Sequence, residues 1–533
     1  MNSKKQFFLY IFILLPFWAI AQNLDTIPFD LPLFVINTNG QDIPNEPKLT
    51  AQLGIINNSD GINFYGDSFT DYDGAIGIEI RGNGSANWAK KSYLFETRKS
   101  DGSNKNVSLL GMPKENDWIL YAPYIDRSGM RNVLTYDLAR DMGGYASRTA
   151  YCELIINGIY KGVYVLAEKI KRDENRVDVP KFEDNVTAAD AGGYIIRTDS
   201  WWNQIVGWES STLYEVDGTP YSPRYQYVYP KFDDIQEDQK QFIQAFMLGV
   251  DEAFYHAPTE GYETLYSDWI DLNSFVDLFI LNEFTQNPDG YRLSTYMYLD
   301  PTAEQPRLKM GPVWDCNVCY ANYYERFGIA AGWDYDNNWW ELNVRIPFWW
   351  NRLMEDDVFK NRLICRWEEL RETLISAEAF NENIDQIDEQ IRVGMERNHS
   401  TWPEDQLTID LNWASTNSYV ADVATLKQWI SDRIDWMDQE LASIKETYIK
   451  KPVKLYPNPT ADHRFNVSYF LESATAIQFQ IYDISGKAIL SGSVAGEKGT
   501  NTLEIQNFHA GAGMYLFELV IGEERFVYKL VRL

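Results

Sequence analysis

NEFTQNPDGYRLSTYMYLDPTAEQPRLKMGPVWDCNVCYAN, residues 282–322, is the stretch that decides how the rest of the chain is interpreted. An apolar run over 275–284 predicts a helix that ends inside it, and a strand-like run over 308–314 lies near its end. Asp289 follows the helix in a polar turn, and Asp315 follows the strand directly. Two carboxylates are therefore expected where rigid elements stop.

Acidic side chains in such positions can serve a divalent cation and a phosphate group, because hard oxygen ligands must converge from fixed points. The plainer interpretation is that Asp289 caps a turn and that Asp315 makes a buried hydrogen bond. These two residues alone do not separate the interpretations, so the rest of the chain has to.

The composition is that of a globular protein, and 533 residues allow about two to four domains. The 18 Trp, 34 Tyr and 27 Phe suit nucleotide or carbohydrate stacking as well as plain core packing. A formal net charge of −29 repels nucleic acid and anionic lipid, so neither is expected as a partner. A site for a polyanion such as ATP would need a local basic pocket and metal ions.

Residues 1–21 have the pattern of a secretory signal peptide. Lys4 and Lys5 precede an apolar run over 7–20, and a small-residue cleavage box ends at Ala21. A membrane anchor is the alternative, but the run is too short to span a bilayer comfortably. No later stretch approaches about 18 consecutive apolar residues, so no transmembrane segment is expected in the mature chain.

The cysteines are few, and two of them form a motif. Cys316 and Cys319 make a C-x-x-C beside Asp315, which is typical of a redox pair, half a zinc site or two small core residues. Because no second C-x-x-C and no nearby His supports zinc, we expect buried thiols or a local disulfide.

Residues 22–199 are predicted to be mostly β, with a glycine-rich turn at 82–84 and an Asn157-Gly158 hairpin turn. The predicted strands cover 76–81, 92–97, 118–121, 151–156, 162–166 and 193–197, and a helix is predicted over 128–142.

Residues 200–449 are predicted to be helical after an aromatic insert or binding loop at 200–230. A β-rich half followed by a helical half predicts an α+β fold with a cleft between the halves. The predicted helices cover 235–255, 272–284, 347–353, 356–376, 377–398 and 420–447.

Residues 453–533 form a separate module whose alternating pattern and frequent turns predict a small all-β sandwich. Its segments YPNPT at 456–460, IYDISGK at 481–487 and GMYLFEL at 513–519, with a short basic end, resemble the type IX secretion sorting domain of Bacteroidota. With the signal peptide, the resemblance implies export through the periplasm, the type IX secretion machinery as a partner, and a secreted or cell-surface location.

Six further segments stand in one order along the central part of the chain and resemble the CotH kinase family, named after spore-coat protein H. The resemblance implies a reduced protein-kinase-like bilobal fold, with a β-rich N-lobe and a helical C-lobe. The segments are IEIRGNGSANWAKKSY (78–93), DWILYAPYIDRSGMRN (117–132), LIINGIYKGVYVLAEKIKRDENRVDV (154–179), GGYIIRTD (192–199), LNEFTQNPDGY (281–291) and GPVWDCN (311–317).

The resemblance also implies roles for acidic and amide side chains. Asp289 takes the position of the catalytic base, and Asp315 that of the metal-binding Asp. Asn287 and Asn317 are further candidates for the metal site, with Asn287 orienting the loop of the base. The family's usual Trp-Asp-Phe-Asp here ends in Cys316 and Asn317, and Ser294 stands five residues after Asp289, where an ordinary kinase has its metal-binding Asn.

Phosphoryl transfer also needs a cation on the phosphates. Lys90 and Lys91 follow the glycine turn and lead into a strand. Lys91 is the first candidate, because the resemblance to the family is tightest at residues 91–93, and Glu168 is expected to pair with it. Lys90, Lys169 and Arg81 are the other candidates for binding the cofactor. Arg127 and Arg131 are candidates for bracing the lobes.

The expected reaction is transfer of the ATP γ-phosphate to a protein Ser or Thr, or to another hydroxyl acceptor, with Mg²⁺ or Mn²⁺. A non-catalytic surface scaffold or adhesin is the main alternative, with the aromatic insert holding a glycan or protein. A glycosidase that uses Asp289 and Asp315 as acid and base is a third possibility.

Overall fold

A computed structural model describes most of the chain. The predicted signal peptide, residues 1–21, and Trp201 and Trp202 of the predicted insert lie outside the described residues. The described ranges are 24–183, 188–200, 206–216, 219–255, 266–323, 328–336, 345–403, 418–449, 453–460, 464–471, 473–506, 508–522 and 524–533.

The N-terminal part is a closed barrel with the strand order β1-β2-β3-β4-β5-β7-β6. It closes because β1 pairs parallel with β6, and apolar side chains fill its interior. Asn157 and Gly158, with φ of +50° and +76°, turn the predicted β6–β7 hairpin. The strands are β1 Leu33–Asn37, β2 Leu49–Ile56, β3 Tyr72–Arg81, β4 Ser92–Thr97, β5 Asp117–Tyr121, β6 Thr149–Ile156 and β7 Ile159–Glu168.

A second sheet has the order β14-β13-β8-β12-β9 and leads into the helical part. β8 was expected to end the N-terminal half, yet it pairs with β12 and β13 of this sheet. The predicted strand over 308–314 is reduced to β14, since Pro312 has no N–H to extend a ladder. The strands are β8 Tyr194–Thr198, β9 Gly207–Glu209, β12 Arg224–Tyr229, β13 Thr295–Leu299 and β14 Lys309–Met310, beside a pair of β10 Tyr214–Val216 and β11 Thr219–Tyr221.

The predicted aromatic insert is largely part of the core. β12 lies inside the second sheet, between β8 and β9. Tyr225 is fully buried and donates to Asp251 at 2.8 Å. Tyr227 is also buried and lies against Trp208 with ring centroids 4.7 Å apart. The expectation of a binding loop is therefore wrong for 224–229, because these aromatic side chains gain more from core burial than from exposure.

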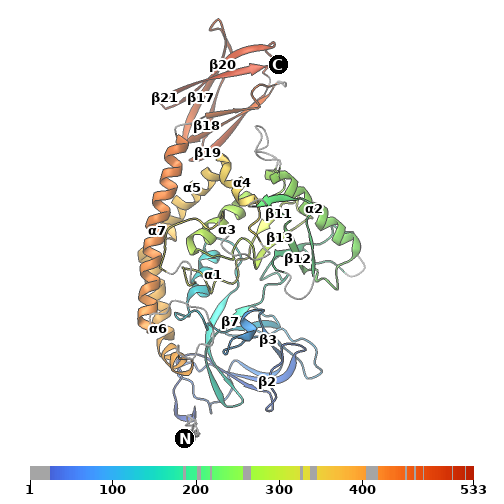
Figure 1. Cartoon of the computed structure of the whole chain (residues 1–533), viewed down its shortest axis with the longest axis vertical. Coiled ribbons are helices and arrows are strands. Elements are labelled where there is room, and N and C mark those ends of the chain that lie inside the picture. The colour runs from blue at the N-terminus through green and yellow to red at the C-terminus, as the bar shows by residue number, and fades with distance from the viewer. Residues whose placement is uncertain are drawn as a thin grey trace, which may run out of the picture.

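Helices surround α3, which is almost wholly buried. Asp271 caps its N-terminus by accepting from the Ser274 N–H at 3.0 Å. Figure 1 shows α6 reaching down to the barrel and α7 running along one side to the C-terminal sheets. The helices are α1 Arg131–Asp141, α2 Glu237–Tyr255, α3 Leu272–Thr285, α4 Trp349–Glu355, α5 Asp357–Thr373, α6 Ala377–Thr401 and α7 Tyr419–Ile449.

The C-terminal module consists of two sheets, β15-β16-β19 and β18-β17-β20-β21, around a small apolar core. Glu368 of α5 joins it to the helical part, with Lys498 at 3.7 Å. The strands are β15 Val453–Tyr456, β16 Phe465–Leu471, β17 Thr475–Asp483, β18 Ala488–Gly496, β19 Gly499–Ile505, β20 Gly513–Ile521 and β21 Glu524–Arg532.

The expected β-rich first part, helical second part and all-β end are thus confirmed. In the described part of the chain, no helix has both the length and the apolar content that a membrane span requires.

Candidate functional site

A cavity of about 570 Å³ lies between the barrel, the second sheet and the loops after α3 and β14. Five carboxylates line it: Glu46 before β2 and Glu79 in β3 on the barrel side, and Asp199 after β8, Asp289 after α3 and Asp315 after β14. Two guanidinium groups line it as well, from Arg81 at the end of β3 and Arg197 in β8. The cavity therefore combines an excess of acids from several elements with two permanent cations.

The loop that carries Asp289 is fixed by its own polar groups. The Asp289 N–H donates to the side-chain oxygen of Asn287 at 3.2 Å, and Asn282 donates to the carbonyl of Gly290 at 2.8 Å. Only glycine fits at position 290, since a Cβ there would lie 2.3 Å from the Asn282 side-chain oxygen. Asn282, Asn287 and Gly290 therefore hold the loop in the shape that presents Asp289.

Asp289 has the protonation behaviour of a general base. Burial, opposed by Arg292 at 3.6 Å and assisted by Asp315 and Asp199, raises its pKa to about 6. Its side chain keeps 37% of its surface exposed, so the carboxylate remains accessible from the cavity. An acid that titrates near neutrality is suited to accepting a proton from a substrate hydroxyl.

Asp315 stands on a left-handed backbone, with φ of +64°. Its N–H donates to the hydroxyl of Tyr136 in α1 at 3.1 Å, and the Tyr136 ring stacks on Trp314 with centroids 5.6 Å apart. Arg81 lies 5.0 Å from the Trp314 ring. Asp315 is exposed to the cavity. Its enclosure among protein groups and nearby Asp199 nevertheless raise its pKa, and Arg81 and Arg197 counteract them. Such a held, sparsely populated backbone conformation is common at functional sites.

Asp199 also lines the cavity, although no role was predicted for it. Its carboxylate accepts from the backbone N–H groups of Ser200, at 2.8 Å, and of Ser294. Arg197 pairs with it at 3.3 Å. Burial raises the pKa of Asp199, although Arg197 and both N–H groups lower it. Asp315 was predicted because it directly follows a strand that was expected to be buried. Asp199 follows a strand in the same way, so the same pattern could have identified it.

Lys90 lies outside the cavity lining. Its ammonium group is buried and donates to the carbonyl of Val163 at 2.5 Å and to the side-chain oxygen of Asn398 at 2.7 Å. Burial lowers its pKa well below the usual value. These contacts join the barrel to α6 and favour a structural role over the predicted binding of a cofactor.

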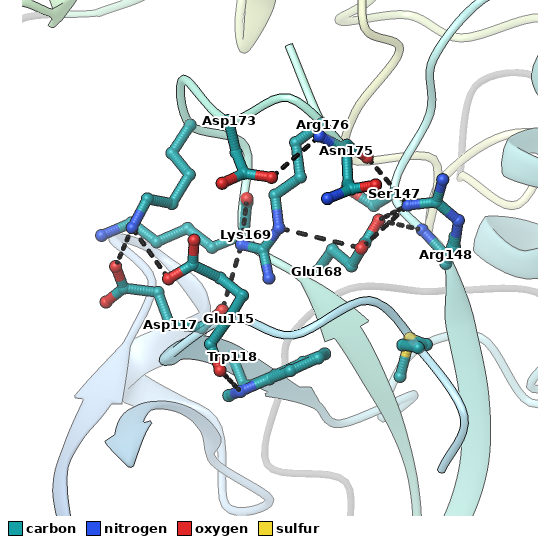
Figure 2. Close-up of polar contacts among 12 residues, drawn as sticks. Glu115, Asp117, Trp118, Ser147, Arg148, Glu168, Lys169, Asp173, Asn175 and Arg176 are labelled. Carbon is teal, nitrogen blue, oxygen red and sulfur yellow. Dashed lines mark hydrogen bonds and ion pairs between the residues drawn. The ribbon is translucent and has the colours of Figure 1, made fainter. Parts of the chain in front are cut away.

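The predicted pair between Lys91 and Glu168 does not form. Lys91 donates to the carbonyl of Ala86 at 2.6 Å, and so ties down the glycine turn. Glu168 is fully buried between Arg148, at 3.0 Å, and Arg176, at 3.8 Å (Figure 2). β5 separates the two strands, and Lys91 and Glu168 lie toward opposite ends of it.

Of the three lysines predicted to bind the cofactor, Lys169 is the one whose charge acts on a residue of the cavity lining. Burial lowers its pKa, and the nearby charge of Asp117 partly offsets this. The Lys169 charge also acts on Glu79, which lines the cavity wall. Figure 2 shows Lys169 among the charged side chains around Glu115 and Asp117.

The two predicted amide ligands differ in position. Asn317 lines the cavity beside Asp315. Asn287 is buried and bridges the Asp289 N–H and the sulfur of Cys316, which lies 3.7 Å from its amide nitrogen. The contacts of Asn287 fit the positioning role, and its role as a metal ligand stays a prediction.

Arg131 braces the loop behind Asp315. Its guanidinium group pairs with buried Asp126 at 2.6 Å and donates to the carbonyl of Cys319 at 3.1 Å. Arg127 contacts α6 in a similar way, by donating to the carbonyl of Trp402 at 3.1 Å. Both arginines therefore connect the barrel side of the molecule to the helical side.

The donor set fits a hard cation, because the cavity offers carboxylate and amide oxygens. Within the described ranges, no three His, Cys, Asp or Glu side chains are grouped so as to hold a metal ion by themselves. Mg²⁺ sites commonly use one or two carboxylates and complete the shell with substrate phosphates and water. Asp315, Asp199 and Asn317 would be the protein's contribution to such a site.

Comparison with known families yields two matches. The model for CotH kinase protein matches residues 78–437, about two thirds of the chain, and the model for a secretion system C-terminal sorting domain matches residues 454–532. Both resemblances seen in the sequence are thereby confirmed. The sorting domain indicates export, followed by attachment to the cell surface or secretion. No curated protein matches the chain.

Proposed function

We propose, from the premise that this chain belongs to the CotH kinase family, that it is an exported phosphotransferase. It moves the γ-phosphate of ATP to a protein Ser or Thr, or to another hydroxyl acceptor. The observation that carries this proposal is the convergence of Asp199, Asp289 and Asp315 with Arg81 and Arg197 on one cavity. In this proposal the barrel is the N-lobe of a kinase-like fold and the helical part is its C-lobe.

Asp289 accepts the proton of the attacking hydroxyl. It is accessible from the cavity, and a pKa of about 6 leaves it ionised at neutral pH. Arg292, which is buried beside it, holds the carboxylate in the charged form. Ser294 is positioned to shape the loop through its N–H bond to Asp199, rather than to replace the metal-binding Asn of ordinary kinases.

Bound Mg²⁺ or Mn²⁺ would supply neutralisation and orientation of the phosphate oxygens. Asp315 and Asp199 would hold the ion, and Asn317 offers an uncharged oxygen where the family has a second carboxylate. Arg81 donates to the remaining phosphate oxygens, since guanidinium groups bind phosphate with two parallel hydrogen bonds. Arg197, which donates to Gln226 and Tyr296, holds Asp199 and adds positive charge to the site. Burial is the main cause of the raised pKa of all three carboxyl groups, and neighbouring acids add to it for Asp289 and Asp315; a bound cation would favour the ionised form of each.

The glycine turn forms the barrel-side rim of the cavity. Gly82 has φ of +112°, and a Cβ there would lie 2.0 Å from the Ser85 hydroxyl. The turn can therefore take this shape only with glycine, and the triphosphate would lie against its backbone. Lys91 supports the turn through Ala86, and this contact gives it an indirect role in place of direct phosphate binding.

Radiolabel transfer tests the proposal. The full-length chain is incubated with Mn²⁺ and γ-³²P ATP, with and without a mixed pool of exported proteins as acceptors. Label should appear on protein with the parent chain and fall by at least about 100-fold with Asp289→Asn, as expected when a general base is lost. Equal labelling by the parent and the variant, or none by either, would refute the assignment.

Asn317 favours a second candidate, a scaffold that binds nucleotide without transferring phosphate. One carboxylate fewer weakens a second metal site. In that case ATP with Mn²⁺ would raise the melting temperature of the protein by mass action, while radiolabel transfer would be absent.

A further inference from the structure

The four residues directly after Asp315 form a tight turn with a cysteine at each end. The Cys319 N–H donates to the carbonyl of Cys316 at 3.2 Å. Such a turn brings its end Cα atoms within about 7 Å, and a disulfide requires about 4.4–6.8 Å. Both thiols are free and fully buried, and they are hydrogen-bonded to each other. The backbone already places the two sulfur atoms for bond formation.

This turn is also a wall of the candidate site. Its two central residues, Asn317 and Val318, line the cavity, and Asp315 precedes it. Asn317 and Val318 are half-buried, whereas the cysteines on either side of them are fully buried. A change at the cysteines therefore acts on the segment that presents Asp315 and Asn317.

A second connection leads from the thiols to the loop of Asp289. The amide nitrogen of Asn287 lies 3.7 Å from the Cys316 sulfur, and its oxygen accepts the Asp289 N–H at 3.2 Å. The Cys319 carbonyl accepts from Arg131 at 3.1 Å. The pair thus touches both loops that carry candidate catalytic acids, as well as the brace between the barrel and the helical part.

We propose that Cys316 and Cys319 are a redox-active dithiol whose closure to a disulfide changes both acid-bearing loops. The oxidant is a disulfide, of a small molecule or of an exchange protein, in the compartments through which the exported chain passes. Two S–H bonds of the dithiol and the S–S bond of the oxidant break, and one S–S bond forms between Cys316 and Cys319 through a mixed disulfide. The electron pair and two protons pass to the oxidant, which leaves as two thiols.

Closure alters the site in two ways. Cys316 is drawn to Cys319 and away from Asn287, so the Asp289 loop loses one anchor. The turn with Asn317 becomes covalently locked. The dithiol chemistry stands independently of the proposed function, whereas its effect on phosphate transfer rests on it.

Thiol counting in the folded full-length protein tests the dithiol. The protein is equilibrated with mixtures of oxidised and reduced dithiothreitol, quenched in acid, denatured and alkylated, and each cysteine is located by peptide mass spectrometry. We expect two thiols to be lost together, with a linked peptide that contains Cys316 and Cys319. Cys152 and Cys365 should stay alkylatable.

Variants sharpen this readout. Cys319→Ser should abolish the two-thiol loss, whereas Cys365→Ser, which changes a half-buried cysteine on α5, should leave it intact. If all four thiols remain free at every ratio, or if the linked pair is a different one, the proposal is wrong. If Cys316 carries only an adduct and never the internal disulfide, the proposal is wrong as well.

Hydrogen exchange tests the coupling without relying on kinase activity. In the oxidised protein, peptides covering 286–294 should exchange at least about 3-fold faster than in the reduced protein, and peptides covering 315–319 should exchange more slowly. Peptides from the C-terminal module should not change. Equal exchange of 286–294 in both forms would refute the coupling, even if radiolabel transfer had already been demonstrated.

Discussion

Replacing Arg292 by Met should shift the pH dependence of the candidate reaction. The Arg292 guanidinium lies 3.6 Å from the Asp289 carboxylate and holds its pKa down. At that distance two unit charges interact by about 5 kcal/mol at an effective dielectric constant of 20. Because Asp289 is 37% exposed, solvent screens this attraction toward the roughly 1 kcal/mol of open pairs. A net loss of about 1.5 kcal/mol corresponds to about one pKa unit.

The fold should tolerate this substitution. Arg292 is buried, and two of its nitrogens, Nε and Nη1, have no hydrogen-bond partner in the structure. Burial of an incompletely paired guanidinium is costly, so an apolar side chain of similar length is close to neutral for stability. The variant therefore changes the charge beside Asp289 more than it changes the packing.

The assay is the pH profile of kcat/KM for Mn²⁺-dependent phosphate transfer, which reports groups of the free enzyme. A base must be deprotonated, so the rate of the parent should fall as the pH drops through about 6, the pKa of Asp289. In Arg292→Met the same fall should occur about one pH unit higher. An acid limb that stays in place in the variant would refute the reasoning, and circular dichroism would verify that both proteins are folded.

Three further substitutions test the structure. Gly82→Ala should lower the free energy of unfolding by about 1–2 kcal/mol and weaken the thermal shift by Mn²⁺ and ATP, because its φ is +112°; Gly84→Ala, with open space around it, should leave the free energy of unfolding unchanged. Burial raises the pKa of Asp251 to about 6, so the folded state binds its proton more tightly than the unfolded state. This tighter binding stabilises the parent fully below about pH 4, and the stabilisation is lost as the pH rises through about 6. The free energy of unfolding of the parent, relative to that of Asp251→Asn, should therefore be about 3 kcal/mol higher at pH 4 than above pH 6. Arg433→Met removes the guanidinium group that pairs with buried Glu283 at 3.4 Å and should cost about 3–5 kcal/mol in urea unfolding; Arg392→Met, at the surface, should leave the urea unfolding curve nearly unchanged.

Local patterns predicted most of the secondary structure. The Asn157-Gly158 turn, the β4 strand and the buried α3 helix lie where the sequence puts them, since each is specified by residues within one or two turns of chain. β12 was missed because its tyrosines read equally well as a binding loop. Only the pairing of β12 between β8 and β9, which depends on distant segments, shows that it belongs to the core.

The site was predictable in part. Asp289 and Asp315 were chosen because they follow buried elements, and both line the cavity. Asp199 also follows a buried strand, but its place in the cavity depends on how loops from distant parts of the sequence pack together. No local pattern predicts that packing. The pairing of Lys91 with Glu168 failed for a similar reason, because the register of β5 with its neighbours places them toward opposite ends.

Anomalous scattering from manganese tests the central claim most directly. Crystals of the full-length chain grown with Mn²⁺ and a non-hydrolysable ATP analogue would locate the ion independently of any assay of activity. The account predicts a manganese peak at about 2 Å from carboxylate oxygens of Asp315, with Asp199 in the same site and the γ-phosphate facing Asp289. A nucleotide bound with its metal elsewhere, or a peak distant from both acids, would contradict it.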